Sequence, residues 1–344
     1  MKQQLFTVNK TSFEMFDAFR AFGLASILTG EGTSAHIRDL GYAYWIDIEG
    51  EIPEAPDFLL FEDTEGWTRI FGTFRERKDS KKQHPRNEVK ELVTQDYTKI
   101  LEMHHEANFI PTIGRRVENG RTLYQSLDVS AAKGYREEKR DVYNEGSQLE
   151  VDKYSWAIAC IGAALSGIWR YGESFVLSLV PNPSDVLLMS HRTIQKDLDT
   201  KVCAISTNTA LIHYAIRLEL LVSERQLSHG TKYDSIIFNV MRKTGQQPKP
   251  GGGGKYRLNF LEDLAKTPAG IFALREIERK FPTSSYAKGI KQNIALGLTE
   301  FLLRPTLENY RAFESLYIRG QIDKKFNPWE KDQLEEILKH VETI

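Results

Sequence analysis

Residues 152–171, DKYSWAIACIGAALSGIWRY, contain the longest apolar run of the chain, from Trp156 to Trp169. This run is shorter than the roughly 20 residues that a bilayer-spanning helix requires, and it ends at the charged Arg170. The segment therefore predicts a buried helix inside a folded domain. A neighbouring helix could approach closely at its small residues, which are Gly162, Ala163, Ala164 and Gly167.

The segments before this helix predict a mixed structure. Phe13–Leu28 (FEMFDAFRAFGLASIL) carries apolar residues with helical periodicity, and Ser12 is in position to cap that helix. Gly41–Glu49 (GYAYWIDIE) alternates in the manner of a strand. Turn residues and further periodic segments predict a hairpin over 58–74, a helix over 87–108 and a second hairpin over 114–123.

The segments after residue 171 become increasingly helical. Short strands are predicted at Phe175–Val180 and Val186–Met189, followed by a long apolar helix at Thr207–Glu224. Five more helices are predicted, over 258–266, 268–280, 284–303, 307–318 and 328–341. The expected fold is α+β. An N-terminal domain over 1–241, with hairpins and buried helices, is followed by a flexible basic glycine-rich loop over 242–257 and an all-helical C-terminal bundle over 258–344.

The charge of the chain is balanced overall but uneven along its length. The 344 residues include 46 basic and 47 acidic side chains, a net charge of −1, so the whole molecule does not attract a polyanion. Residues 1–74 hold 5 basic and 12 acidic side chains, whereas residues 75–86 alone hold 6 basic and 2 acidic. Any nucleic-acid binding must therefore come from local patches.

The stretch RKTGQQPKPGGGGKYR at 242–257 contains five basic residues, no acidic residue and four consecutive glycines, Gly251–Gly254. Glycines keep the backbone mobile and let it approach a ligand closely. Pro248 and Pro250 do not fit a helix or a central strand. The stretch predicts a mobile cationic loop suited to a polyanion, and a plain solvated linker is the alternative.

Three basic segments are the predicted nucleic-acid contacts, because each cation that neutralises a phosphate releases counterions. The amides of Gln246 and Gln247 could read base edges, and Tyr256 could stack on a base. The nominated residues are Arg75, Arg77, Lys78, Lys81, Lys82, Arg86, Arg115, Arg116, Gln246, Gln247, Lys249, Lys255, Tyr256 and Arg257.

One pattern suggests catalysis. Pro56-Asp57 followed by Glu76-Arg77-Lys78 formally matches the PD-(D/E)xK arrangement of metal-dependent nucleases. In that arrangement Asp57 and Glu76 would hold Mg²⁺ and Lys78 would orient the attacking water. Short motifs of this kind arise often by chance. The nuclease is therefore kept as an alternative, and the primary prediction is a protein that is not an enzyme and holds no metal.

Other motifs of catalysis and cofactor binding are missing. Gly254-Lys255 is not part of a P-loop, because Lys249 stands where the first glycine is needed and Tyr256 replaces the Ser or Thr that binds Mg²⁺. There is no dinucleotide fingerprint and no nucleophile elbow, so no cofactor is predicted. Two isolated cysteines and an N-terminus without an apolar segment predict a cytoplasmic protein without a membrane partner.

The order of these features resembles the large subunit of type I CRISPR surveillance (Cascade) complexes, in its compact version. The residues that carry the resemblance are FDAFRAFGLASIL leading into GYAYWIDIE, the helix WAIACIGAALSGIW, and GGGGKYRLNFLEDLAKTPAGIF leading into a helical tail. Such subunits have an α+β N-terminal domain and a C-terminal helical bundle, and they act in antiviral defence.

The resemblance implies a non-catalytic role in a ribonucleoprotein. The chain would bind guide RNA, target DNA and other protein subunits of the effector complex. It would recognise the target-adjacent motif on duplex DNA and help to open and hold the strands. Two alternatives stay open, which are the metal-dependent nuclease of a defence system and a structural scaffold subunit without direct nucleic-acid contact.

Overall fold

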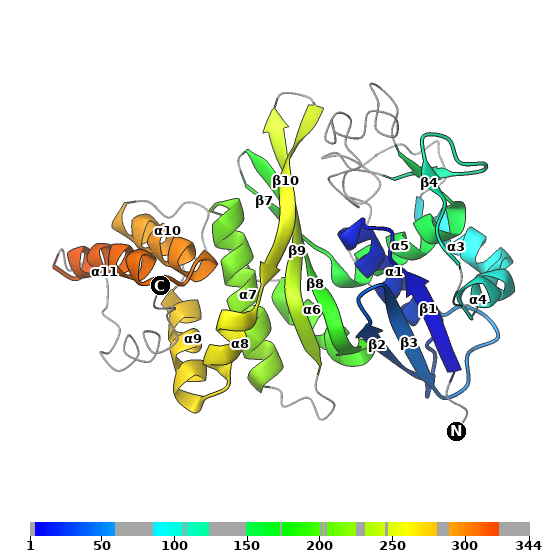
Figure 1. Cartoon of the computed structure of the whole chain (residues 1–344), viewed down its shortest axis with the longest axis horizontal. Coiled ribbons are helices and arrows are strands. Elements are labelled where there is room, and N and C mark those ends of the chain that lie inside the picture. Colours follow the sequence, from blue (N-terminus) through cyan, green and yellow to red (C-terminus); the bar gives the residue numbers. More distant parts are fainter. Residues whose placement is uncertain are drawn as a thin grey trace.

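The computed structural model describes residues 4–58, 85–105, 107, 109–123, 149–172, 174–199, 202, 205–224, 231–244, 247–280 and 289–322. Over these residues the chain has the predicted α+β fold, with an antiparallel sheet flanked by helices (Figure 1). Two predicted elements, the hairpin over 58–74 and the helix over 328–341, lie outside the described residues except for Phe58.

The described residues form a seven-stranded antiparallel sheet in the order β1-β3-β2-β8-β9-β10, with β7 paired to β8. The strands are β1 (Gln4–Asn9), β2 (Ser34–Asp39), β3 (Ala43–Glu49), β7 (Ile168–Tyr171), β8 (Phe175–Leu187), β9 (Lys232–Thr244) and β10 (Gln247–Arg257). The strand predicted at Gly41–Glu49 is confirmed as β3. The two short strands predicted at 175–189 are instead the single strand β8, which runs through Pro181 and Pro183 with register shifts against β9.

Two predicted helices, α1 (Glu14–Ile27) and α5 (Lys153–Ser166), are present and pack against each other through glycines. The helix predicted over 152–171 ends early, because Ile168–Tyr171 form strand β7. A Cβ atom added to Gly162 would lie 1.7 Å from the carbonyl oxygen of Phe19, and one added to Gly23 would lie 1.9 Å from that of Ile158. The two backbones are therefore in direct contact, as the small residues of the apolar run predicted.

The start of α1 differs from the expectation. Phe13 occupies the N-cap position without a side-chain capping bond, and Ser12 has a positive φ of 74°. The backbone N–H of Thr11 donates instead to Asp17 Oδ2 in the first turn of the helix, at 2.7 Å. This bond holds the segment before the helix against its first turn, but it does not replace the bond from a first-turn N–H that was predicted for Ser12.

The segment after β3 holds two short helices and a small sheet. The predicted helix over 87–108 is divided into α3 (Pro85–Gln95) and α4 (Tyr97–His105). The predicted hairpin over 114–123 is wrong: β4 (Ile113–Gly114) and β5 (Arg121–Thr122) do not pair with each other. Both pair with β6 (Glu150–Val151), a strand far along the chain that the local sequence could not reveal.

The predicted flexible loop over 242–257 is also wrong, because this segment is most of a β-hairpin. Strand β10 pairs with β9 along its length, so that Lys249 stands opposite Arg242 and Tyr256 opposite Ile236. A register shift between Pro250 and Gly252 accommodates the prolines and glycines. Proline is tolerated here because β10 lies at the edge of the described sheet.

Helices follow the hairpin, as predicted. They are α8 (Asn259–Ala265), α9 (Pro268–Lys280), α10 (Ile290–Leu303) and α11 (Leu307–Ile322), which group beside α7 (Thr207–Glu224) in Figure 1. A helix that the sequence did not predict, α6 (Leu188–Asp199), lies between α7 and the α1–α5 pair.

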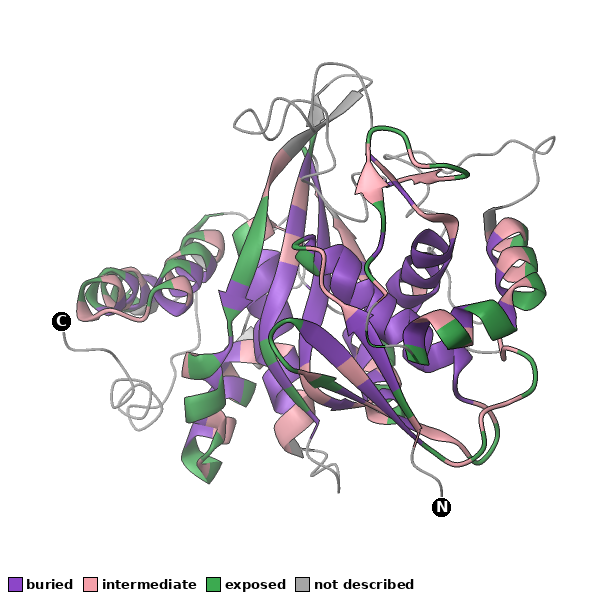
Figure 2. Ribbon diagram, turned by 45° about the vertical axis from the view of Figure 1, so that its right-hand side comes forward, coloured by how far each residue is buried: buried purple, intermediate pink, exposed green. Residues whose placement is uncertain are grey.

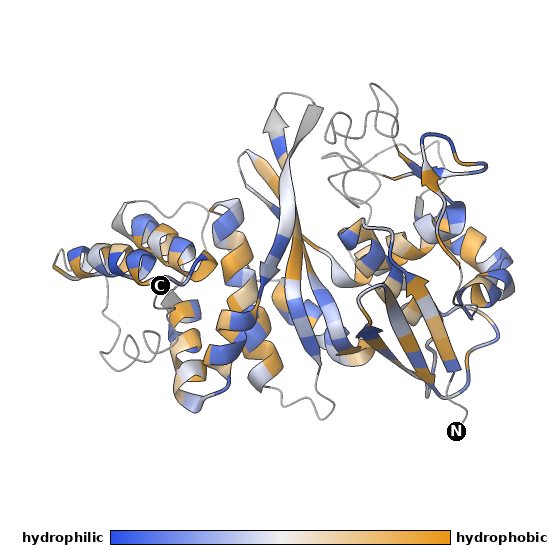
Figure 3. Ribbon diagram, in the orientation of Figure 1, coloured by the Kyte–Doolittle hydropathy of each residue, from blue (hydrophilic) through white to orange (hydrophobic). Residues whose placement is uncertain are grey.

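One continuous cluster of buried apolar side chains connects all these elements, from Phe6 in β1 to Tyr317 in α11. Figure 2 shows the buried residues concentrated on the sheet and on the helices against it. In Figure 3 the apolar residues of α7, α10 and α11 are interleaved with hydrophilic ones, the pattern of helices with one buried side. The division into domains at residues 241 and 258 stays a prediction.

The length and apolar character of the helices bear on whether the described chain could cross a lipid bilayer. Among those that the structure describes, none has both the length and the apolar character of a membrane-crossing segment.

Candidate nucleic-acid interface

The outer end of the β9–β10 hairpin brings basic residues from two strands together. Lys249 of β10 stands opposite Arg242 of β9, and Pro248 opposite Lys243. The side chain of Arg242 is exposed and forms no hydrogen bond or ion pair with any other described residue. Figure 1 shows this end of the hairpin extending beyond the other strands of the sheet. Three positive charges therefore stand on a projecting ribbon.

The glycines Gly251–Gly254 leave this part of β10, the edge strand of the hairpin, without side chains. Gly251–Gly254 belong to the outermost described strand, and these residues are half-buried to exposed. Gly252 has a φ of +114°, in which only glycine is unstrained, and the space around it is open. A sugar–phosphate backbone could therefore approach the peptide backbone of β10 closely along this edge.

The inner end of β10 is fixed to both helical layers. Lys255 forms an ion pair with Glu14 of α1 at 2.9 Å. Tyr256 is buried, and its hydroxyl donates to the carbonyl oxygen of Leu302 in α10 at 2.8 Å. Burial raises the pKa of the Tyr256 hydroxyl well above its usual range. Its ring is therefore not available for the predicted stacking on a base, whereas Arg257 is exposed.

Strand alternation explains the different positions of these three neighbours. Lys255, opposite Ile237, is on the α1 side of the sheet, and Tyr256, opposite Ile236, is on the α10 side. As a loop, residues 242–257 were expected to form one continuous contact surface. In the strand, the side chains of adjacent residues point to opposite faces of the sheet.

A second basic segment lies at the same end of the molecule as the hairpin tip. Arg115 and Arg116 follow β4 and are exposed, and β4 is in the upper part of Figure 1, as is the outer end of the hairpin. Arg116 forms no ion pair with any other residue in the described part of the chain. Nearby, Arg121 is paired with Glu88 at 2.7 Å and is therefore already neutralised.

The remaining nominated residues are only partly placed. Arg86 is half-buried on α3, and Gln247 is the first residue of β10. Several others lie outside the described residues, namely Arg75, Arg77, Lys78, Lys81, Lys82 and Gln246. Of the alternative nuclease residues, Asp57 is half-buried after β3, while Glu76 and Lys78 are outside the described part.

Sequence reasoning missed the contribution of β9. Residues Tyr233–Val240 (YDSIIFNV) are rich in β-branched and aromatic side chains, a signal that favours a strand. Recognising that strand would have supplied a partner for the glycine-rich segment. It would also have placed Arg242 opposite Lys249.

Comparison with known proteins finds a similarity that extends over most of the chain. No family model matches the chain. The chain is similar to a protein of Archaeoglobus fulgidus described as an uncharacterized protein, with 28% identity over 348 residues. The similarity covers 96% of this chain and 97% of that protein, so it extends over nearly the whole length of both.

Proposed function

We propose that the chain is a non-catalytic nucleic-acid-binding subunit of an RNA-guided CRISPR effector complex in the cytoplasm. In this role it recognises the target-adjacent motif on duplex DNA and helps to open and hold the DNA strands. The observation that carries the proposal is the projecting β9–β10 hairpin, with its basic outer end and its glycine edge.

The shape of the hairpin suits a nucleic-acid groove. The major groove of B-DNA, about 12 Å wide, admits a two-stranded β-ribbon. Proteins with strands in a groove contact base edges with the ribbon and phosphates with its flanking cations. Arg242, Lys243 and Lys249 are such cations, and Gly251–Gly254 remove the side chains that would keep a phosphate backbone at a distance.

The charge distribution makes the hairpin important for affinity. Because the net charge of the chain is −1, attraction to a polyanion depends on a small number of local cations. The exposed Arg115 and Arg116 at the same end of the molecule would extend the contact beyond the hairpin. The resemblance to the Cascade large subunit supports guide RNA and neighbouring protein subunits as the other partners.

The test neutralises the outer end of the hairpin. In the triple variant Arg242→Gln, Lys243→Gln, Lys249→Gln, we expect the affinity for a 30-base-pair duplex to fall at least about tenfold at moderate salt. If all three cations contact phosphates, the slope of log K against log salt should become shallower by about 2.7, since each contact contributes about 0.9. Fluorescence anisotropy across a salt series measures both quantities.

A matched control removes the same charge elsewhere. Lys99 on α4, Lys196 on α6 and Lys266, directly after α8, are exposed, and in Figure 1 these helices lie away from the outer end of the hairpin. Their triple replacement by Gln should leave the salt slope within error of the wild type. Equal losses in both triple variants would mean that only net charge matters. An unchanged slope in the hairpin variant would favour the scaffold alternative.

Assembly is tested separately, by affinity purification of the tagged full-length chain from its native cells. A ribonucleoprotein with several protein subunits and a discrete guide RNA is the expected result. A chain recovered alone and free of RNA would contradict the proposal even if the hairpin binds DNA in isolation.

A further inference from the structure

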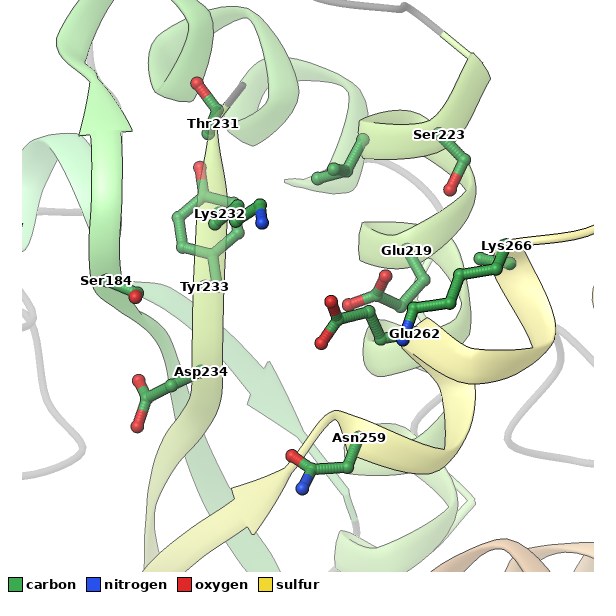
Figure 4. Close-up of a pocket in the computed structure, with 12 residues that line it drawn as sticks. Ser184, Glu219, Ser223, Thr231, Lys232, Tyr233, Asp234, Asn259, Glu262 and Lys266 are labelled. Atoms are coloured by element: carbon green, nitrogen blue, oxygen red, sulfur yellow. The ribbon is translucent and has the colours of Figure 1, made fainter. Parts of the chain in front are cut away.

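A pocket of about 410 Å³ lies at the other end of β9 from the basic hairpin tip. Figure 4 shows it between the start of β9 and the helices α7 and α8. Its lining residues are Ser184, Glu219, Val222, Ser223, Thr231, Lys232, Tyr233, Asp234, Asn259, Glu262, Ala265 and Lys266. The proposed function does not use this pocket.

The most unusual group in the pocket is the carboxyl group of Glu219. This side chain is only 6% exposed, and it comes from the apolar helix α7. It forms no hydrogen bond or ion pair with any other residue that the structure describes. Figure 4 shows its carboxyl group directed into the pocket, towards Glu262 of α8. Buried polar groups in proteins nearly always have a hydrogen-bond or charge partner, and the Glu219 carboxyl group is an exception among the described residues.

The neighbouring basic residues do not supply that partner. Lys266 lines the pocket, but its ammonium group is paired at 2.6 Å with Asp263, a residue that does not belong to the lining. Lys232 is exposed and forms no ion pair with the described residues. Asp234 accepts a hydrogen bond from Asn182 at 2.6 Å, and the Tyr233 hydroxyl contacts His191 Nδ1 at 2.9 Å. The other groups around Glu219 are thus engaged, exposed or acidic.

We propose that this pocket binds an organic cation, with an ammonium or guanidinium group held by the carboxylates of Glu219 and Glu262. A cation gives the buried carboxylate the charge partner that no described side chain provides. An anion is disfavoured by the same two carboxylates. The side chains of Val222 and Ala265 and the ring of Tyr233 would contact the carbon chain that carries the cation.

The size and chemistry of the pocket favour an organic cation over a metal ion. The described His, Cys, Asp and Glu residues include no group of three or more that could hold a metal. A volume of about 410 Å³ is in the range of pockets for small organic molecules. A free polyamine and a Lys or Arg side chain of a partner protein share the required chemistry, and the experiment below separates these two sources.

Binding should be linked to proton release. Burial, and secondarily the nearby Glu262, raise the pKa of Glu219 to about 8. At pH 7 the free pocket therefore holds Glu219 mostly protonated, and a bound cation favours its ionised form. One proton then leaves the carboxyl group for solvent as the cation enters. The other titratable or charged groups around Glu219 are Lys232, Tyr233 and Asp234 on β9, Tyr256 on β10, and Glu262 and Lys266 on α8.

The experiment is isothermal titration calorimetry of the full chain with two probes, spermidine and N-acetyl-arginine methylamide. We expect saturable binding of at least one probe, with close to one proton released per site at pH 7, measured in buffers of different ionisation enthalpy. For the guanidinium probe, which stays charged, affinity should rise about tenfold from pH 7 to pH 9 as Glu219 ionises.

Three variants make the assignment specific. Glu219→Gln keeps the shape of the side chain and should abolish both binding and proton release. Lys232→Met removes a cation from the lining and should strengthen binding severalfold. Glu300→Gln changes an exposed carboxylate on α10 and should change neither quantity.

The outcomes separate the two sources and can refute the site. Binding of spermidine alone assigns a free polyamine, whereas binding of the arginine probe assigns a partner side chain. No heat from either probe at millimolar concentration overturns the proposal. Undiminished binding to Glu219→Gln, with its fold verified by circular dichroism, overturns it as well. None of these results depends on nucleic-acid binding, so failure here and failure of the proposed function are distinct.

Discussion

Replacing Gly162 by alanine is expected to lower the free energy of unfolding by about 3 kcal/mol or more. The added Cβ atom would lie 1.7 Å from the carbonyl oxygen of Phe19 and 2.8 Å from the backbone nitrogen of Gly23. Both obstacles are backbone atoms, so no side chain can rotate away. The helices α1 and α5 would have to separate, and each contributes heavily to the buried core.

The sign of this effect makes the test decisive. In an exposed helix, the same change from Gly to Ala would stabilise the protein by about 1 kcal/mol. Urea unfolding followed by circular dichroism measures the difference. Gly114→Ala is the matched control, because a Cβ atom there has no neighbour within 4 Å, and its effect should stay within about 0.5 kcal/mol. A stabilised Gly162→Ala variant would contradict the close contact of the two helices.

Replacing Asp17 by alanine should cost about 3 to 5 kcal/mol, because it leaves the guanidinium group of Arg20 buried without its counterion. Arg20 is completely buried, and its Nη1 lies 3.1 Å from Asp17 Oδ1 and 2.9 Å from the carbonyl oxygen of Asn9. Its Nε and Nη2 atoms have no hydrogen-bond partner among the described residues. The variant also loses the two hydrogen bonds that Asp17 accepts from Thr11.

A second variant tests whether the stranded charge causes the loss. Asp17→Ala combined with Arg20→Met removes both charges and should recover a large part of the stability, since an apolar replacement of a buried pair is often tolerated. Asp263→Ala breaks an exposed pair of the same spacing, Asp263–Lys266, and should cost less than about 1 kcal/mol. A double variant no more stable than Asp17→Ala would show that the hydrogen bonds of Asp17 matter more than its charge.

The helices were the most predictable part of the fold. The segments that became α1, α5 and α7 have long apolar patterns, and local periodicity is sufficient to define them. Gly162 was recognisable as a contact because small residues in an apolar helix allow close approach. The orientation of α1 against α5 needed the structure, since only coordinates match Gly23 with Gly162.

The hairpin was missed for a physical reason. Five glycines and two prolines have low intrinsic strand propensity, so the segment at 242–257 resembled a loop. Pairing with β9 overrides that propensity, because β9 supplies the buried side chains and β10 needs only its backbone for the ladder. Local propensity cannot report a partner strand, and β4, β5 and β6 were misassigned for the same reason.

The two sites differ in how far the sequence could reveal them. The basic residues of the hairpin were visible as composition, although their division between two faces was not. Glu219 was hidden because either of the two acidic residues in the apolar helix TNTALIHYAIRLELLVSE looks like a solvent-facing position. Its burial depends on α8 and β9, which come from later in the chain.

The hairpin is anchored at its inner end and projects at its outer end. At its inner end, Lys255 is joined to α1 and Tyr256 to α10, on opposite sides of the same strand, while the outer end extends beyond the sheet. A ligand that pulls on the outer end, near Arg242 and Lys249, therefore acts on a strand whose base is held at two points. A load on the outer end would therefore pass to α1 through Lys255 and to α10 through Tyr256.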